Sequence, residues 1–329
     1  MTTSGPFLSA QSFFALAKEV TRGTAVTPPT IFIPISPNPT LDPKLTWVTG
    51  DYIVGSPVKT LDMVPSVEYD EYSCKGFVFA DTFPNLMKGV LGGTDTITGS
   101  VAPFTHSIPL LNTPATGSQP PSYTGYDVDQ LVEGTSAAKQ FAGGMFATVD
   151  MTFAVTGALN WSAKVVGNPY VEVKVPTPTF STEVFIPAWS ATVTIATIGV
   201  RVLTTGKFTV KRTTKSIFTI GQQSPYQNFS DVIQVTGSFT FLALSTDTTL
   251  VKGLTRTHQP VKLTFTDPVS THSVEFQMSA VQYKTPKVDR SKPEVEVTTS
   301  FEAIANTTDA ATGYAPIKFQ AVNAQATAY

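Results

Sequence analysis

Alternation of apolar and polar positions is clearest between residues 145 and 166. Every odd position from Met145 to Val165 is apolar or glycine, and the even positions are mostly Thr, Asp, Asn, Ser and Lys. A period of two is typical of a β-strand with one buried face and one wet face. The phase survives Gly157, although a two-residue hairpin loop would reverse it. The pattern therefore predicts either one long bent strand or two strands joined by a loop with an odd number of residues.

A second alternating segment spans residues 231–244. Its apolar or small positions are Ile233, Val235, Gly237, Phe239, Phe241 and Ala243. Residues 153–163 and 233–243 align, with Val-Thr-Gly in phase and bulky side chains at matching positions. Two interpretations remain open: an internal duplication, or a chance likeness between two amphipathic strands.

Shorter runs predict further strands and two short helices. The strands are predicted at Val67–Phe79, Ala191–Ala196, Lys207–Ile220, Val261–Phe265, Val274–Tyr283 and Val295–Ala305. One helix is predicted at Gln11–Val20, from the spacing of its apolar residues. The other is predicted at Phe83–Leu91, where Gly92 and Gly93 offer a C-cap. Turn residues separate most strands, which indicates an all-β sandwich or barrel with minor α content.

Two segments are rich in proline and poor in charge. Residues 23–43 contain six prolines and predict an extended arm or edge segment. Residues 96–126 contain five prolines and no Asp, Glu, Lys or Arg. So long a loop is more often functional or interfacial, and disordered linkers usually carry charge. We expect this loop to become ordered against a neighbouring subunit, with an ordinary extended surface loop as the alternative.

The boundaries of the chain's parts follow from proline and from small polar residues. Asn168–Thr182, with three prolines, is the best candidate linker, and the chain becomes small and polar after Asn306. The sequence thus predicts an N-terminal half with long Pro-rich loops (1–167), a β-rich C-terminal half (168–306) and a C-terminal arm (307–329).

The composition is low in charge. Charged residues make up 14% of the 329 residues, against about 25% in typical soluble domains. Uncharged surface tends to associate, so copies of the chain are expected to cover one another. The net charge of −2 provides no basic excess for holding a nucleic-acid backbone.

The single cysteine, Cys74, excludes an intramolecular disulfide and is expected to be a small, partly buried apolar residue. The first residues lack the basic and apolar regions of a signal peptide, and no apolar run approaches a transmembrane length. We expect synthesis and folding in a cytoplasm, without a membrane partner.

Patterns that carry catalytic or metal chemistry are absent from the sequence. His106, His258 and His272 lie far apart, without the spacing of metal ligands. No Gly-rich phosphate loop and no Gly-x-Ser-x-Gly turn is present. The sequence therefore predicts a protein that is not an enzyme, with no catalytic, cofactor-binding or metal-binding residues and no cofactor.

Three small groups of charged residues could each form a site or an ordinary surface. The acidic sets are Glu68, Asp70 and Glu71, and then Asp127 and Asp129. Their oxygens could hold a cation, and a solvated strand face is the other interpretation. The basic set is Lys211, Arg212 and Lys215. It lacks the interleaved aromatic residues of a nucleic-acid reader, so we expect it to contact an acidic neighbour.

The order of several motifs resembles the major tail tube proteins of long non-contractile-tailed phages, in particular phages of actinobacteria. These motifs are Ala17–Ala25 followed by prolines, Phe83–Gly92, Phe104–Ile108, Pro120–Thr124 and Phe141–Met145. The resemblance covers the first half of the chain and continues weakly to Asn306.

The resemblance implies a β-sandwich flanked by a helix. It also implies hexameric rings in which subunits pool strands into one barrel around a channel, and which stack through loops and arms into the tail tube of the virion. The implied partners are the chain itself, the tape measure protein, the tail terminator or distal tail proteins, and passing double-stranded DNA that is not bound specifically. The family has no catalytic residues to carry over.

The wet faces of the two alternating segments predict a polar, neutral to acidic channel wall. They carry Thr148, Asp150, Thr152, Thr156, Asn160, Ser162, Gln234, Thr236, Ser238 and Thr240, with Lys164 as the one basic residue. Such a wall would let DNA slide, because it pairs few phosphates with cations. The alternative is that these are ordinary solvated strand faces.

Two other classes of protein remain as alternatives. A tail adhesin or carbohydrate-binding β-sandwich would expose clustered aromatic residues. Tyr123 and Tyr126 lie close in sequence, but Trp47, Trp161 and Trp189 are scattered, and Trp161 falls on the predicted buried face. A capsid or head-completion protein would have long helices, which the sequence does not predict.

Overall fold

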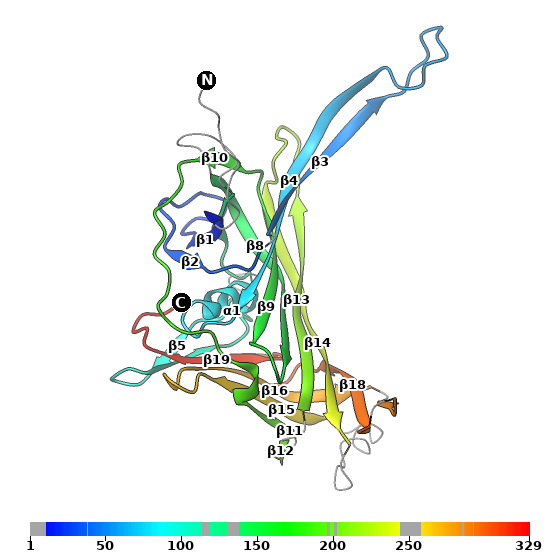
Figure 1. Ribbon diagram of the computed structural model, residues 1–329. Coiled ribbons are helices and arrows are strands. Elements are labelled where there is room, and N and C mark those ends of the chain that lie inside the picture. The colour runs from blue at the N-terminus through cyan, green and yellow to red at the C-terminus, as the bar shows by residue number, and fades with distance from the viewer. Residues whose placement is uncertain are drawn as a thin grey trace, which may run out of the picture.

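Long antiparallel strands dominate the computed structural model of the chain (Figure 1). The structure describes residues 11–37, 39–113, 117, 119–129, 138–195, 198–200, 203–243, 258–284, 286–291 and 293–329. Within them it has one α-helix and many strands, so the predicted all-β class with minor α content is confirmed. No helix among these residues is long and apolar enough to cross a membrane.

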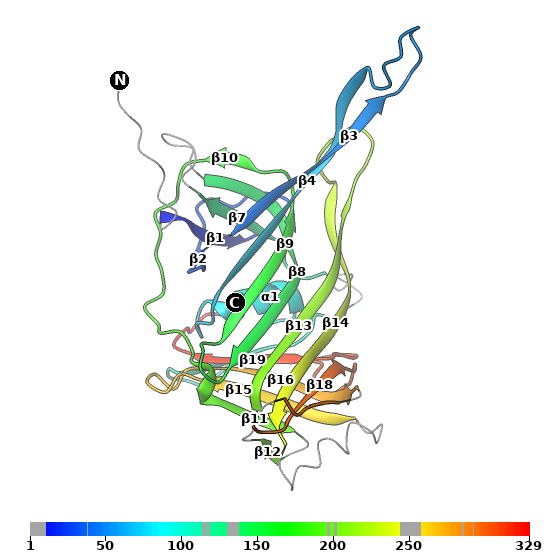
Figure 2. The ribbon, with the colours of Figure 1, turned by 45° about the vertical axis from the view of Figure 1, so that its right-hand side comes forward.

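The longest strands form one antiparallel sheet, here called the long sheet (Figures 1 and 2). Its strands, in spatial order, are β3 (Thr40–Gly50), β4 (Asp62–Phe77), β9 (Asn160–Gly167), β8 (Ala138–Ala154), β13 (Leu203–Ile217), β14 (Gln227–Leu242), β18 (Glu296–Ala303) and β17 (Lys287–Asp289). Figure 2 shows β9, β8, β13 and β14 running side by side.

A second sheet, here called the cross sheet, lies below the long sheet in Figure 1. Its order is β12 (Ile198–Val200), β11 (Ala191–Ile195), β15 (Gln259–Thr266), β16 (Ser273–Tyr283), β19 (Lys318–Asn323), β6 (Phe104–Ile108) and β5 (Thr96–Thr98). The two sheets join where Val281–Tyr283 of β16 pair with Phe301–Ala303 of β18. A short 3-10 helix, Ala188–Ser190, precedes β11.

A small third sheet branches from the first half of β8. It contains β2 (Ile31–Ile33), β1 (Phe13–Lys18), β7 (Tyr123–Val128), β8 and β10 (Val171–Val173). The helix α1 (Phe83–Leu91) contacts β8, β13, β19 and β6, so it fills the space between the sheets. A large apolar core joins the helix to most strands of the three sheets, and a smaller core with Phe13, Phe32 and Tyr126 lies within the small sheet.

The helix predicted at Gln11–Val20 is wrong, because the segment forms β1. This strand pairs with β2 on one side and β7 on the other, and Phe13 to Ala17 are all buried. A strand buried on both faces has no alternation, so a short apolar run cannot be told from a buried helix. The sheet context decided the structure here.

The helix predicted at Phe83–Leu91 is confirmed with those bounds. Gly92 follows it with a φ of 79°, and its N–H donates to the carbonyl oxygen of Lys88. Residues other than glycine adopt this left-handed conformation only with strain, which explains why a glycine caps the end of the helix.

The alternating segment 145–166 forms two strands joined by an odd loop, which was the second of the two predicted possibilities. β8 ends at Ala154 and β9 begins at Asn160, so five residues connect them. Phe153, Trp161 and Val165 are buried, whereas Val155 is exposed because it lies in the loop. The predicted strand in 231–244 is confirmed up to Leu242, where β14 ends, and residue 244 lies outside the described residues.

The other predicted strands are found, with bounds that differ by a few residues. They are β4, β11, β13, β15, β16 and β18, although Ala196, at the end of one prediction, lies outside the described residues. The aligned segments 153–163 and 233–243 have different structures, since one contains the β8–β9 loop and the other lies in β14 and the residue after it. The duplication therefore stays one of the two open interpretations.

The Pro-rich segments are built into the sheets more than expected. Residues 96–126 include β5, β6 and the start of β7, so a single long loop is wrong for them; residues 114–116 and 118 lie outside the described part. In residues 23–43, β2 pairs with β1 alone among the described strands, as an edge segment would. Residues 307–329, predicted as an arm, contain β19, which pairs with β16 and β6. The division at residue 167 stays a prediction.

Candidate assembly and channel surfaces

The outer part of the β3–β4 hairpin, residues 45–65, extends away from the body and is here called the hairpin arm (Figures 1 and 2). β4 pairs with β9 only from Asp70 onward, so before that residue its ladder partner is β3 alone. An isolated two-stranded hairpin is marginally stable in water. The hairpin arm therefore needs a further surface to rest on.

Apolar side chains lie exposed on both faces of the hairpin arm. Val48 is opposite Val64 on one face, and Trp47 is opposite Pro65 on the other. Between 37% and 97% of each of the following residues is exposed: Leu45, Trp47, Val48, Tyr52, Ile53, Val54, Val58, Leu61, Met63 and Val64. Large exposed apolar patches usually mark interaction surfaces, so the hairpin arm has the chemistry of a contact element.

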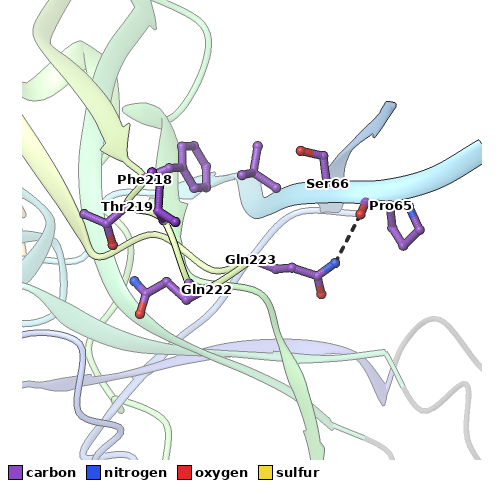
Figure 3. A pocket seen from close by; sticks show the side chains of 9 residues that line it. Pro65, Ser66, Phe218, Thr219, Gln222 and Gln223 are labelled. Atoms are coloured by element: carbon purple, nitrogen blue, oxygen red, sulfur yellow. Dashed lines mark hydrogen bonds between the residues drawn. The ribbon is translucent and has the colours of Figure 1, made fainter. Parts of the chain in front are cut away.

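The base of the hairpin arm is held by the loop between β13 and β14 (Figure 3). The N–H of Glu68 donates to the carbonyl oxygen of Gln223 at 3.1 Å, and Gln223 Nε2 donates to the carbonyl oxygen of Pro65 at 3.4 Å. The rings of Tyr69 and Phe218 lie 6.3 Å apart. Between loop and arm lies an open pocket of about 570 Å³. These contacts position the arm relative to the long sheet.

The long sheet has one apolar face and one polar face. Val149, Met151, Phe208, Val210, Val235 and Phe239 are buried on the apolar side, toward α1 and the cross sheet. The opposite side, here called the polar face, carries the alternate residues of β9, β8, β13, β14 and β18. They are Asn160, Ser162, Lys164, Thr148, Asp150, Thr152, Thr205, Lys207, Thr209, Lys211, Gln234, Thr236, Ser238, Thr240, Thr298, Ser300 and Glu302.

Hydrogen bonds tie the polar side chains together across neighbouring strands. Asp150 accepts hydrogen bonds from the hydroxyls of Thr209 and Ser162. The hydroxyls of Thr240 and Thr298 lie 2.9 Å apart, and Gln234 Nε2 donates to Glu302 at 2.8 Å. A concavity of about 740 Å³ lies over the middle of this face, lined by Asp150, Lys207, Thr236, Ser300 and others.

The predicted wall residues of β8, β9 and β14 do lie together on this face, except Thr156, which is in the loop. The face carries more cations than the single Lys164 expected, because β13 lies between β8 and β14 and adds Lys207 and Lys211. Both lysines are exposed. Neither alternating segment contains β13, so an estimate from those segments alone missed its charges. That a polar, neutral to acidic face lines a channel stays a prediction.

The three histidines do not meet. His106 is fully buried, with Nδ1 at 2.8 Å from Asp95 and Nε2 at 2.9 Å from the carbonyl oxygen of Gln325. Nδ1 of His272 lies 2.9 Å from Glu183, and His258 is exposed. Across the described ranges, no group of His, Cys, Asp and Glu is arranged to hold a metal ion. Cys74 is buried, and burial raises the pKa of its thiol.

The acidic sets form neither a cation site nor a solvated face. Burial raises the pKa of Asp70 to about 6, and its carboxylate accepts from the N–H of Tyr170 at 2.7 Å. Burial likewise raises the pKa of Asp127 to about 6. Asp129 pairs with Lys139 at 2.6 Å. Beside Asp70 in the first set, Glu71 pairs with Lys164 at 2.9 Å, and the backbone N–H of Glu68 holds the β13–β14 loop.

The basic set divides between two environments. Arg212 is buried and donates to the carbonyl oxygen of Val90 at 3.1 Å and to that of Asp231 at 3.2 Å. It thus binds the end of α1, where free carbonyls favour a cation. Burial lowers the pKa of Arg212 to about 10. Lys211 and Lys215 are exposed instead.

The hairpin arm was not predicted from the sequence. Its signal was available: apolar runs at 45–48 and 61–64 flank the turn residues Gly55, Ser56 and Pro57. Of the aromatic residues considered for an adhesin, Tyr123, Tyr126 and Trp161 are buried, whereas Trp47 and Trp189 are exposed on different elements.

The described residues thus present two candidate contact surfaces on a large antiparallel sheet, the hairpin arm and the polar face. The family described as phage tail tube protein matches residues 9–321. The chain belongs to this family, as its resemblance in sequence predicted. Its role is therefore structural, in the tail of the virion, where the subunits self-assemble. No curated protein gives a significant match.

Proposed function

We propose that the chain forms hexameric rings that stack into the tail tube of a long non-contractile-tailed phage, through which the DNA genome passes into the host. The hairpin arm is the observation that carries this proposal. It presents apolar side chains on both faces, and a second copy of the chain is the partner that tail tube assembly supplies. Obligate interfaces bury on the order of 2,000 Å² or more and are rich in apolar contacts.

Ring closure is supported by the edge of the long sheet. The described residues of β3 pair only with β4, which leaves the far side of Thr40–Lys44 without a partner strand. Open edges promote pairing with another chain, and closure into a barrel removes them. In the proposed ring, the long sheets of neighbours pool their strands, and the polar face lines the channel.

The tape measure protein would occupy this channel before DNA, and terminator and distal tail proteins would contact the two ends. These partners are part of the proposal. Assembly would take place in the cytoplasm of the host bacterium.

The proposal is tested by shortening the hairpin arm. In the variant, residues 51–61 are replaced by Asn-Gly, which favours a two-residue hairpin turn. Negative-stain microscopy should show tubes for the full chain and none for the variant, while circular dichroism shows the same β content in both. Unchanged tubes from the variant would contradict the role of the arm. As a control, Asp51→Asn alters the arm by one polar group and should leave tubes intact.

A further inference from the structure

An apolar patch lies exposed at the end of the long sheet opposite to the hairpin arm, and is here called the basal patch. It consists of Phe77, Val155, Val184, Phe185 and Trp189, each between 42% and 63% exposed. Phe77 is the last residue of β4, Val155 follows β8, and Trp189 lies in the 3-10 helix before β11. Exposed patches of large apolar side chains usually mark interaction sites.

Contacts between three segments make the basal patch one surface. The rings of Phe77 and Phe185 lie 5.1 Å apart, which joins the end of β4 to the segment before the 3-10 helix. The N–H of Ala188 in that helix donates to the carbonyl oxygen of Gly157 at 2.9 Å. The loop between β8 and β9 is thereby held against the 3-10 helix, so the five exposed side chains come from neighbouring segments.

The strand β4 connects the hairpin arm to the basal patch. Met63 and Val64, near its start, are exposed in the arm, and Phe77, its last residue, belongs to the patch. From Met63 to Phe77 the strand spans about 46 Å, at about 3.3 Å per residue. Figure 2 shows β4 running from the arm to the end of the sheet where β9 begins, and Phe77 pairs there with Asn160. The two apolar surfaces therefore lie at opposite ends of each subunit.

The two surfaces match in chemistry, because both offer apolar side chains and few charges. Three segments that build the basal patch contain no Asp, Glu, Lys or Arg: residues 77–80, 155–159 and 184–190. In the hairpin arm, the carboxylates of Asp51 and Asp62 accept hydrogen bonds from within the arm, at 3.1 Å and 2.8 Å. A charged ligand would lose its hydration at the basal patch without gaining an ion pair, whereas an apolar arm gains from burial.

We infer that the basal patch is the receptor for the hairpin arm of another copy, in the ring stacked next to it. The inference rests on the proposed function, in which the arm contacts a second subunit. A contact between different surfaces at opposite ends of one molecule repeats without closing, and so generates a filament. Trp47 of the arm and Trp189 of the patch are of the residue type that most often dominates binding energy at interfaces. All subunits of the tube then point the same way along its axis.

Crosslinking tests whether these two surfaces meet. One chain carries Ser56→Cys in the turn of the hairpin arm, a second carries Thr156→Cys beside Val155, and both positions are exposed. Cys74 can remain, because it is buried and its thiol stays protonated. The two chains are mixed before assembly, and a short bismaleimide is added to the tubes. The matched control pairs Ser56→Cys with Ser100→Cys, an exposed position before β6.

We expect mass spectrometry to find the peptide of residue 56 joined to that of residue 156 in tubes, and no joined peptide for the control pair. An equal yield from the control pair, or no product with residue 156 in tubes, would overturn the inference. The same product from separate, unstacked rings would place the contact within one ring and would also overturn it.

Assembly of a second variant measures how much the patch contributes. The variant is Trp189→Ser with Val155→Thr, and the control is Tyr314→Ser with Val101→Thr, at positions that are 64% and 75% exposed on other elements. Circular dichroism should show the same β content in both. The protein concentration needed for tubes should rise at least about tenfold in the variant, while rings persist, and should change within about twofold in the control.

The outcomes separate this inference from the proposed function. Tubes from the Trp189 and Val155 variant at an unchanged concentration, or an equal shift in the control, would reject the receptor role of the basal patch alone. An absence of rings and tubes from the unaltered chain would reject the proposed function.

Discussion

The carboxylate of Glu19 accepts a hydrogen bond from the backbone N–H of Gly143 at 2.7 Å and so fixes the bend of β8. Gly143 has a φ of 66°, at the point where β8 leaves the small sheet and enters the long sheet. Glu19 also accepts from the Ser122 hydroxyl at 2.6 Å and the Thr124 hydroxyl at 3.0 Å. The buried carboxylate of Glu19, just after β1, thus holds the start of β7 and the bend of β8 together, at the point where the polar face begins.

Replacing Glu19 by Ala should destabilise the fold. The change leaves the buried Gly143 N–H and two hydroxyls without their acceptor, and one unsatisfied buried group costs about 1–3 kcal/mol. We expect a loss of about 3 kcal/mol in the free energy of unfolding, measured by denaturant titration. Lys18→Ala, at the neighbouring exposed position, is the control and should change stability little. Equal effects of both changes would contradict the role of the carboxylate.

Charges placed on the two faces of the β8–β9 hairpin should have opposite consequences. Trp161 is 2% exposed and its Nε1 donates to the carbonyl oxygen of Phe77 at 2.9 Å. Trp161→Asp buries an unpaired charge and should cost at least about 4 kcal/mol. Phe153→Asp should act similarly. Thr152→Asp places its charge on the polar face beside Lys207 and should shift stability by about 0.5 kcal/mol or less.

Thermal unfolding of these variants checks the assignment of faces. If Thr152→Asp proved as damaging as Trp161→Asp, the polar face would have to be covered within the chain itself.

Asp70 should make stability fall as pH rises from about 4 to about 6. Burial raises the pKa of its carboxyl from 3.8 to about 6, so over this window the unfolded chain releases its proton first and the native state is penalised. Asp70→Asn removes that penalty and keeps an oxygen for the Tyr170 N–H. At pH 7.5 the variant should be more stable than the unaltered chain by about 1–2 kcal/mol.

The same comparison at pH 3.5 is the control, because the Asp70 carboxyl is protonated there in the native state and is as neutral as the amide of the Asn variant. There the difference in melting temperature should largely vanish, as measured on samples without tubes. A gain that did not depend on pH would instead assign the effect to packing.

The sequence predicted the hairpin of β8 and β9 and the helix α1 because each has a local signal. Alternation of apolar and polar residues indicates a half-buried strand, and the glycine after Leu91 indicates the C-terminal end of the helix. β1 was mistaken for a helix because burial on both faces erased its alternation. Whether Phe13–Ala17 forms a strand depends on β2 and β7, which lie far away in sequence.

The candidate surfaces were predictable in part. The wet residues of β8 and β14 could be identified from sequence, but their position on either side of β13 depends on long-range pairing. The charge of the polar face therefore could not be summed from two segments. Likewise, the exposure of Trp47 and Ile53 depends on whether another part of the chain packs against the hairpin arm. Local sequence patterns do not encode such contacts.

A reconstruction of assembled tubes from electron micrographs would show whether this chain builds a tube whose channel is lined by the polar face. We expect rings of six subunits, with Thr209 facing the channel and Trp47 of the hairpin arm packed against another copy. A reconstruction with the polar face on the outside of the tube, or with the hairpin arm surrounded by solvent, would contradict it.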